Sequence, residues 1–96
     1  MRFEYDSKKA ASNEKKHGVS FEEAITVFED PLLLLLEDSS EAEENRFIAA
    51  GFSELSRFLL VVHCIGEASN NEEIIRIISA RPATKREKKH LEEVRQ

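Results

Sequence analysis

The fold of this chain is decided by two stretches, Phe58-Leu-Leu-Val-Val-His-Cys-Ile65 and Ile74-Ile-Arg-Ile-Ile-Ser-Ala80. The first is almost continuously apolar, which is typical of a central strand that is covered on both faces. The second is apolar except at Arg76 and Ser79. Residues 66–71, between them, are rich in Gly, Ser and Asn, which favour turns. The two stretches therefore predict two sequential antiparallel strands in the middle of a sheet.

Three further strands are expected upstream of this pair. Residues 32–36 are five leucines, a run too short for an isolated helix, and residues 45–52 are small or apolar except at Arg46. Residues 37–45 are acidic and polar and are expected to form a loop, and residues 53–57 a turn. Residues 3–5 alternate apolar and polar side chains, as a short half-buried strand does.

Capping signals predict three helices. Asp6 can cap a helix over residues 7–17, which Gly18 ends. Ser20-Phe-Glu-Glu23 is a capping box that opens a second helix, which stops at Asp30-Pro31. Thr84-Lys-Arg-Glu87 is another capping box and opens a last helix that runs to about residue 94. The order β-α-α-β-β-β-β-α predicts one α+β domain over residues 1–96, with an antiparallel sheet packed by two N-terminal helices and a C-terminal helix.

The charge of the chain is unevenly distributed. Lys and Arg number 14 and Asp and Glu 19, and the net charge of −5 argues against a surface that is basic as a whole. Residues 21–44 contain nine acidic residues and no basic one, whereas residues 81–96 contain six basic and three acidic residues, a net charge of +3. Any contact with nucleic acid is therefore expected to be local.

Composition excludes several classes of protein. The single cysteine, Cys64, excludes an intrachain disulfide and a cysteine-based zinc site. The longest aliphatic run is far shorter than the roughly 20 residues that span a bilayer, and residues 1–20 are unlike a signal peptide. The histidines at 17, 63 and 90 show no ligand spacing. We therefore expect a cytoplasmic domain without a metal, another cofactor or a membrane segment.

The motifs of the chain are more specific than its periodicity. The first half contains Phe3-Glu-Tyr-Asp6, Lys9, Asn13-x-x-Lys-His-Gly-Val-Ser-Phe-Glu-Glu-Ala24 and Val27-Phe-x-Asp-Pro31. The second contains Glu44-x-Arg46, Gly51-x-Ser53, Leu60-Val-Val-His63 and Arg76-Ile-Ile-Ser-Ala-Arg81-x-Ala83-Thr84-x-x-Glu87. In this order and at this separation, over about residues 3–89, these motifs resemble the signature of the BrnT family.

The resemblance implies a bacterial toxin of a type II toxin–antitoxin pair with a RelE-like fold. Such a toxin cleaves RNA as a metal-independent endoribonuclease and thereby inhibits translation. It is neutralised by BrnA, a ribbon-helix-helix antitoxin, and meets operator DNA only indirectly, through that antitoxin. His90 and Leu91 stand where relatives commonly have an Arg-Tyr-like pair. An alternative reading is therefore a catalytically inactive homologue that acts as an antitoxin-binding co-repressor.

Metal-free RNA cleavage needs a base for the ribose 2′-hydroxyl, a cation for the phosphorane and an acid for the leaving 5′-oxygen. Arginine suits the cation, because its planar fork grips two phosphate oxygens. The candidate catalytic residues are His17, Arg46, Arg76, Arg81 and Glu87. Their structural alternatives are ion pairs for the arginines, a helix-end charge for His17 and the capping box for Glu87. His63 is expected to be a packed, hydrogen-bonded residue.

Strand geometry sets a condition on the arginines. Residues five apart in a regular strand point to opposite faces, so Arg76 and Arg81 can act together only if a bulge near Ser79 or an early strand end intervenes.

Binding residues are expected at both ends of the chain. The candidates for RNA contact are Lys16, Lys85, Arg86 and Lys89, with a solvated helix face as the alternative. The acidic middle suggests a basic antitoxin surface. Because one core face can bury only alternate residues of Leu32, Leu33, Leu34, Leu35 and Leu36, we expect one set of these leucines to be covered by the antitoxin or by a second copy in a homodimer.

Overall fold

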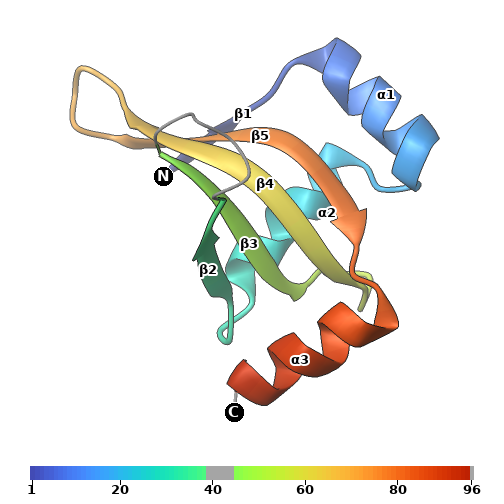
Figure 1. The fold of residues 1–96 in the computed structure, drawn as a ribbon. Helices are drawn as coiled ribbons and strands as arrows, with labels where there is room; N and C mark the ends of the chain where they lie inside the picture. The colour runs from blue at the N-terminus through green and yellow to red at the C-terminus, as the bar shows by residue number, and fades with distance from the viewer. Residues whose placement is uncertain (39–44, 96) are drawn as a thin grey trace.

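A computed structural model describes residues 1–38 and 45–95 (Figure 1). The elements follow one another as β1 (Arg2–Glu4), α1 (Ser7–His17), α2 (Phe21–Thr26), a 3₁₀ turn (Val27–Glu29), β2 (Leu34–Glu37), β3 (Arg46–Phe52), β4 (Phe58–Glu67), β5 (Glu73–Pro82) and α3 (Lys85–Arg95). This confirms the predicted α+β class and the order of the elements.

The strands form one sheet in the order β1-β5-β4-β3-β2. Strands β2 to β5 form the predicted antiparallel meander. The sheet is not antiparallel throughout, however, because β1 pairs in parallel with β5, Phe3 opposite Ile75. A helical connection between β1 and the later strands makes this parallel pairing feasible. The sheet is therefore mixed.

Both N-terminal helices begin at their predicted caps. The Asp6 carboxylate accepts hydrogen bonds from the backbone N–H of Lys8 and Lys9, and Gly18 ends α1 in the left-handed conformation at φ 70°. The Ser20 hydroxyl accepts a hydrogen bond of 3.0 Å from the Glu23 N–H. The acidic half of that box differs from expectation, because the Glu23 carboxylate contacts Ser53 and Arg57.

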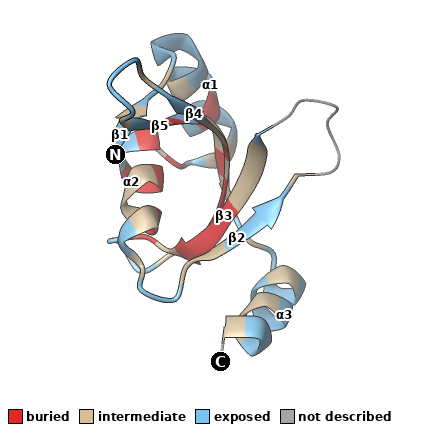
Figure 2. Ribbon diagram, turned by 90° about the vertical axis from the view of Figure 1, so that its left-hand side faces the viewer, coloured by how far each residue is buried: buried red, intermediate tan, exposed pale blue. Residues whose placement is uncertain are grey.

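Helices cover the two faces of the sheet unequally (Figure 2). The main core lies on the α2 side, where Phe21, Ala24 and Val27 pack against Leu59 and Val61. On the opposite face a smaller cluster joins Ala50, Phe58 and Leu60 to Leu91 of α3. The helix α3 covers only one end of this second face, and the rest remains open.

The leucine run differs in two respects from expectation. Strand β2 begins at Leu34 and ends at Glu37, because Pro31 and Leu32 form a turn. Exposure does not alternate along the run either. The side chains of Leu32, Leu35 and Leu36 are 55%, 52% and 37% exposed, while Leu33 and Leu34 are half-buried. Since β2 is an edge strand, it leaves apolar surface open on both faces.

Asn13 attaches α1 to the edge of β5. Its side-chain Nδ2 donates to the carbonyl oxygens of Ala80 at 2.8 Å and Val19 at 3.0 Å, and its Oδ1 accepts from the Ala80 N–H at 3.1 Å. The side chain is buried and pairs with the backbone of Ala80 as a neighbouring strand would. In the described ranges 1–38 and 45–95, no helix is both long and apolar enough to cross a membrane.

Candidate functional site

A bulge in β5 brings the predicted arginines to one face of the sheet. Val62 of β4 lies opposite Ser79, whereas His63 lies opposite Ile77, so Ile78 is an extra residue in β5. As a result Arg76 lies opposite Cys64 and Arg81 opposite Leu60. These partners are alternate residues of one strand and share a face. The structure thus has the bulge that Arg76 and Arg81 need in order to lie on the same face of the sheet.

Arg46 lies on the same face. It is opposite Cys64 in the β3–β4 pairing, so Arg46, Cys64 and Arg76 form one row across three strands. The row of Arg81 and Leu60 is four residues farther along β4, roughly 13 Å at about 3.3 Å per residue. The three arginines therefore form two groups, with Arg46 and Arg76 at one end of the face and Arg81 at the other.

The first group is held in ion pairs. Arg46 Nε donates to Asp38 Oδ2 at 3.1 Å, and both side chains are largely buried. Arg76 Nη1 donates to Glu4 Oε1 at 3.0 Å across the β1–β5 pair, and both of these side chains are more than 40% exposed. Arg76 thus keeps solvent-facing donors, whereas Arg46 is mainly enclosed.

The second group joins β5 to α3. Arg81 donates two hydrogen bonds of 2.8 Å to the two carboxylate oxygens of Glu87. Glu87 also completes the predicted capping box, because Oε1 accepts from the Thr84 N–H and Thr84 Oγ1 accepts from the Glu87 N–H. The Arg81 guanidinium, followed by the Thr84 N–H, lowers the pKa of Glu87 to about 2. At neutral pH Glu87 is therefore a carboxylate that fixes the guanidinium.

His17 lies in a hollow between α1 and β5. The hollow has a volume of about 210 Å³, and its lining residues are Lys9, Ser12, Asn13, Lys16, His17, Ile78 and Ser79. Because Ser79 lies opposite Val62, it is between Arg76 and Arg81 on their face of the sheet. The structure thus places His17 and Lys16 beside the strand that carries two of the predicted arginines.

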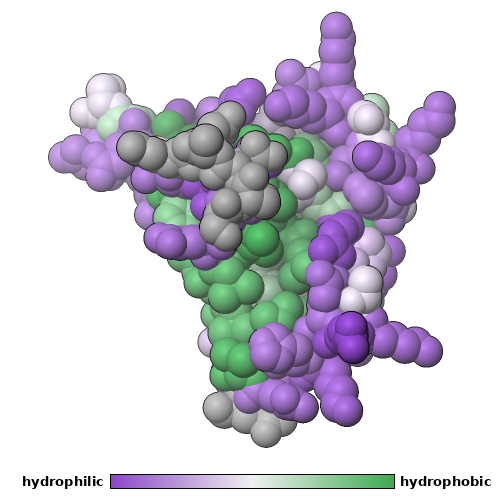
Figure 3. Space-filling view, in the orientation of Figure 1, coloured by the Kyte–Doolittle hydropathy of each residue, from purple (hydrophilic) through white to green (hydrophobic). Residues whose placement is uncertain are grey.

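The basic residues of α3 follow Arg81 closely in the sequence. Lys85, Arg86 and Lys89 are exposed in the first half of this helix, and Lys88 Nζ lies 5.5 Å from the ring centre of Phe52. Figure 3 shows hydrophilic residues over α1 and α3 at the right of this view, and apolar surface at its centre and lower left. In this view the hydrophilic surface over α1 and α3 is therefore separate from the apolar surface at the centre.

His63 is not available to a substrate. Its side chain is 1% exposed, its Nδ1 lies 3.1 Å from the Val61 carbonyl oxygen, and its ring meets Phe28 edge-on. Burial lowers the pKa of His63, as expected for an imidazole in an apolar environment. The prediction of a packed histidine at this position is confirmed.

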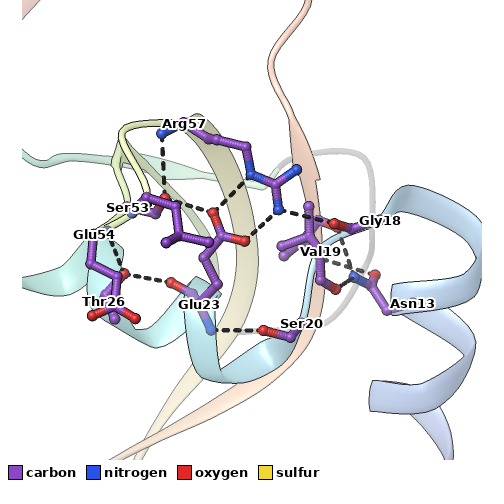
Figure 4. A network of polar contacts seen from close by, with 11 residues as sticks. Asn13, Gly18, Val19, Ser20, Glu23, Thr26, Ser53, Glu54 and Arg57 are labelled. Atoms are coloured by element: carbon purple, nitrogen blue, oxygen red, sulfur yellow. Dashed lines mark hydrogen bonds and ion pairs between the residues drawn. The ribbon is translucent and has the colours of Figure 1, made fainter.

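The structure also contains a partly buried polar network that the sequence did not predict (Figure 4). Arg57 donates from Nε to Glu23 Oε2 at 2.9 Å and from Nη2 to the Gly18 carbonyl at 2.9 Å. Ser53 Oγ donates to the same carboxylate at 2.6 Å. The hydrogen bond from Arg57 is the main cause that lowers the pKa of Glu23. The network fixes the β3–β4 turn to the junction of α1 and α2 and is structural.

Comparison with known proteins decides the family. Residues 5–87 match the family described as ribonuclease toxin, BrnT, of type II toxin-antitoxin system. The chain belongs to the BrnT family. The crystal structure of the Brucella abortus ribonuclease toxin BrnT, at 1.1 Å resolution, is similar in fold, with a TM-score of 0.63, 20% sequence identity, and coverage of 88% of this chain and 99% of that chain. A search of curated proteins gave no match.

BrnT membership confirms the resemblance drawn from the motifs and implies an antitoxin as partner. The matched range contains all five candidate catalytic residues, and it also contains Lys16, Lys85 and Arg86. Lys89 lies beyond it.

Proposed function

We propose that this BrnT chain is an endoribonuclease that cleaves RNA without a metal ion, inhibits translation in this way, and is neutralised by a BrnA-like ribbon-helix-helix antitoxin. The observation that carries the proposal is the common face made by the Ile78 bulge. It brings Arg76 and Arg81 to the side of the sheet that α2 leaves open, with Ser79 between them and His17 beside Ser79. Arginine N–H donors on an open face suit a polyanionic substrate.

The residues take different roles in this proposal. His17, half-buried at the end of α1, exchanges protons with the ribose hydroxyl or the leaving oxygen. Arg81 stabilises the phosphorane, since its side chain is 42% exposed and the ion pair with Glu87 holds its guanidinium in one orientation. Glu87 acts through Arg81, because a carboxyl group with a pKa of about 2 holds no proton to donate at neutral pH. Arg46 and Arg76 bind the RNA backbone farther along the face.

The test is cleavage of RNA by the purified chain with and without EDTA. Cleavage that survives the chelator, and that falls at least 100-fold in the combined variant His17→Ala, Arg76→Ala and Arg81→Ala, is the expected result. Arg2→Ala is the matched control, because it removes an exposed arginine from the β1 edge. Cleavage lost with EDTA would contradict the metal-free mechanism. A wild-type chain that binds antitoxin and cleaves no RNA would favour the co-repressor alternative.

The open leucines are the proposed antitoxin surface. Leu35 and Leu36 expose apolar side chains on an edge strand, and the nine acidic residues of the segment 21–44 surround them in the sequence. Leu35→Glu with Leu36→Glu is expected to weaken antitoxin binding at least 10-fold, because it places charges in an apolar interface. Leu55→Glu, at an even more exposed leucine of the β3–β4 turn, is the control. The measurement is titration calorimetry, and equal loss in both variants would refute the assignment.

A further inference from the structure

The hollow between α1 and β5 has a consistent chemical character. Lys9 and Lys16 contribute ammonium groups, Ser12 and Ser79 contribute hydroxyls, and His17 contributes an imidazole. Among the described residues that line it there is no Asp or Glu. Its volume of about 210 Å³ is several times the roughly 30 Å³ that a water molecule takes up in the liquid. A hollow with donors of this kind and no carboxylate favours an anion.

Helix geometry explains why these side chains converge. Lys9, Ser12, Asn13 and Lys16 are spaced i, i+3, i+4 and i+7, so they lie on one face of α1. Asn13, at the middle of that face, is fixed to the backbone of Ala80 by two hydrogen bonds. The helix cannot turn or slide along β5 without breaking them. The ammonium groups are therefore held on the side of the helix that meets the strand.

The bulge completes the hollow from the other side. Ile78 and Ser79, which line it, are the extra residue of β5 and its neighbour. Arg81 is two residues beyond Ser79 on the same face, at roughly 7 Å along the strand. An anion in the hollow thus lies beside the phosphate position proposed for Arg81, at a spacing that one continuous strand of nucleic acid can span.

We propose that this hollow binds a backbone phosphate of the RNA next to the scissile one, through Lys9, Lys16, Ser12 and Ser79. The proposal rests on the proposed function in that it takes the bound polyanion to be the substrate. It adds Lys9, Ser12 and Ser79 to the residues that hold the RNA. It also gives the toxin a second fixed point on the strand, which orients the 2′-hydroxyl toward His17.

The experiment measures binding of an oligonucleotide with 2′-O-methyl groups, which cannot be cleaved because it lacks the nucleophilic hydroxyl. The test variant is Lys9→Gln with Lys16→Gln. The control is Lys8→Gln with Lys15→Gln, which removes the same charge from positions of α1 that do not line the hollow. The test variant is expected to raise Kd about 10-fold and to reduce the salt dependence by roughly 0.7 per lost phosphate contact, with less than a twofold change in the control. Equal changes in both pairs would overturn the subsite.

A second measurement does not depend on charge removal. Titration of the wild-type chain with inorganic phosphate is expected to shift the backbone amide NMR signals of Ser12, Ile78 and Ser79. Shifts elsewhere, or none, would count against the site. Ser79→Ala is expected to weaken oligonucleotide binding about threefold without changing the charge.

The outcomes separate the subsite from the proposed function. If the wild-type chain binds through the hollow but cleaves no RNA, the proposed function fails and the subsite stands. If it cleaves RNA and the two lysine pairs behave alike, the subsite alone fails.

Discussion

Glu87 shows how one side chain can serve both a helix and a neighbouring strand. Its carboxylate accepts two hydrogen bonds from Arg81 and one from the Thr84 N–H, and its pKa is about 2, against an ordinary value of 4.5. A pKa that is lower in the folded state than in the unfolded chain stabilises the fold at higher pH. This contribution is complete above about pH 4.5 and is lost as the pH falls toward 2.

Replacing this carboxylate should therefore change the acid sensitivity of the protein. In Glu87→Gln, the free energy of unfolding is expected to fall by about 1 kcal/mol at pH 7, since the pair is partly exposed. It is also expected to fall less steeply than that of the wild type between pH 4.5 and pH 2. Urea unfolding at a series of pH values measures both. Parallel curves for the two proteins would show that Glu87 titrates normally.

At the residue scale, what the sequence could predict depended on distance along the chain. Ser20 and Thr84 cap helices that start next to them, and Gly18 ends the helix just before it, so local sequence patterns predicted all three.

Non-local contacts were not predictable in this way. The partner of Glu23 is Arg57, 34 residues away, and no local pattern predicts it. The role of Gly51 is equally non-local, because a side chain there would come within 3.0 Å of Asp30 Oδ2.

At the scale of elements, the apolar strands β4 and β5 were predictable because burial on both faces leaves a continuous apolar run. The parallel pairing of β1 with β5 was not predictable, since a strand of three residues contains no pattern that identifies the strand it pairs with. The bulge was foreseen only as a condition on Arg76 and Arg81. The bulge lies at Ile78 because of the register between β4 and β5. The sequence of one strand alone does not determine that register.

The attachment of α1 to β5 depends on Asn13. Asn13→Ala would leave the buried N–H and C=O of Ala80 without their side-chain partner, along with the Val19 carbonyl. We expect the free energy of unfolding to fall by about 3 kcal/mol in urea denaturation, because unsatisfied buried groups are costly. Lys15→Ala, on the exposed side of α1, should change it by less than about 0.5 kcal/mol. A small effect of Asn13→Ala would mean that water replaces the side chain at the strand edge.

At the scale of the molecule, an ion pair docks α3 on the open face. Arg95 Nη2 donates to both oxygens of Asp30, at 3.0 and 2.9 Å, and both side chains are 7% exposed. The guanidinium also lies over the rings of Phe52 and Phe58. Burial would raise the pKa of Asp30, but hydrogen bonds from the N–H of Phe52 and of Leu32, together with Arg95, outweigh this effect and lower it.

Removing one member of this pair should loosen the C-terminal helix. Asp30→Ala is expected to cost about 3 kcal/mol, because it leaves the buried Arg95 charge and the Phe52 N–H unpaired. Arg95→Ala should cost less, since Asp30 keeps its backbone donors, and Glu93→Ala on the exposed side of α3 is the control. Urea denaturation ranks the three variants. An Arg95 effect larger than that of Asp30 would show that the aromatic contacts matter more than the ion pair.

The parallel pairing of β1 with β5 has a consequence for synthesis. Glu4 and Arg76, which face each other in that pair, are 72 positions apart in the sequence. Asn13 and its hydrogen-bond partner Ala80 are 67 positions apart. Strand β1 and Asn13 therefore find these partners only when β5 has emerged from the ribosome. Loops of this length delay folding. The hollow beside α1 thus cannot form before β5 has emerged, and an incomplete chain that ends before β5 carries the lysines and the histidine of α1 without Ile78 and Ser79, which line the other side of the hollow.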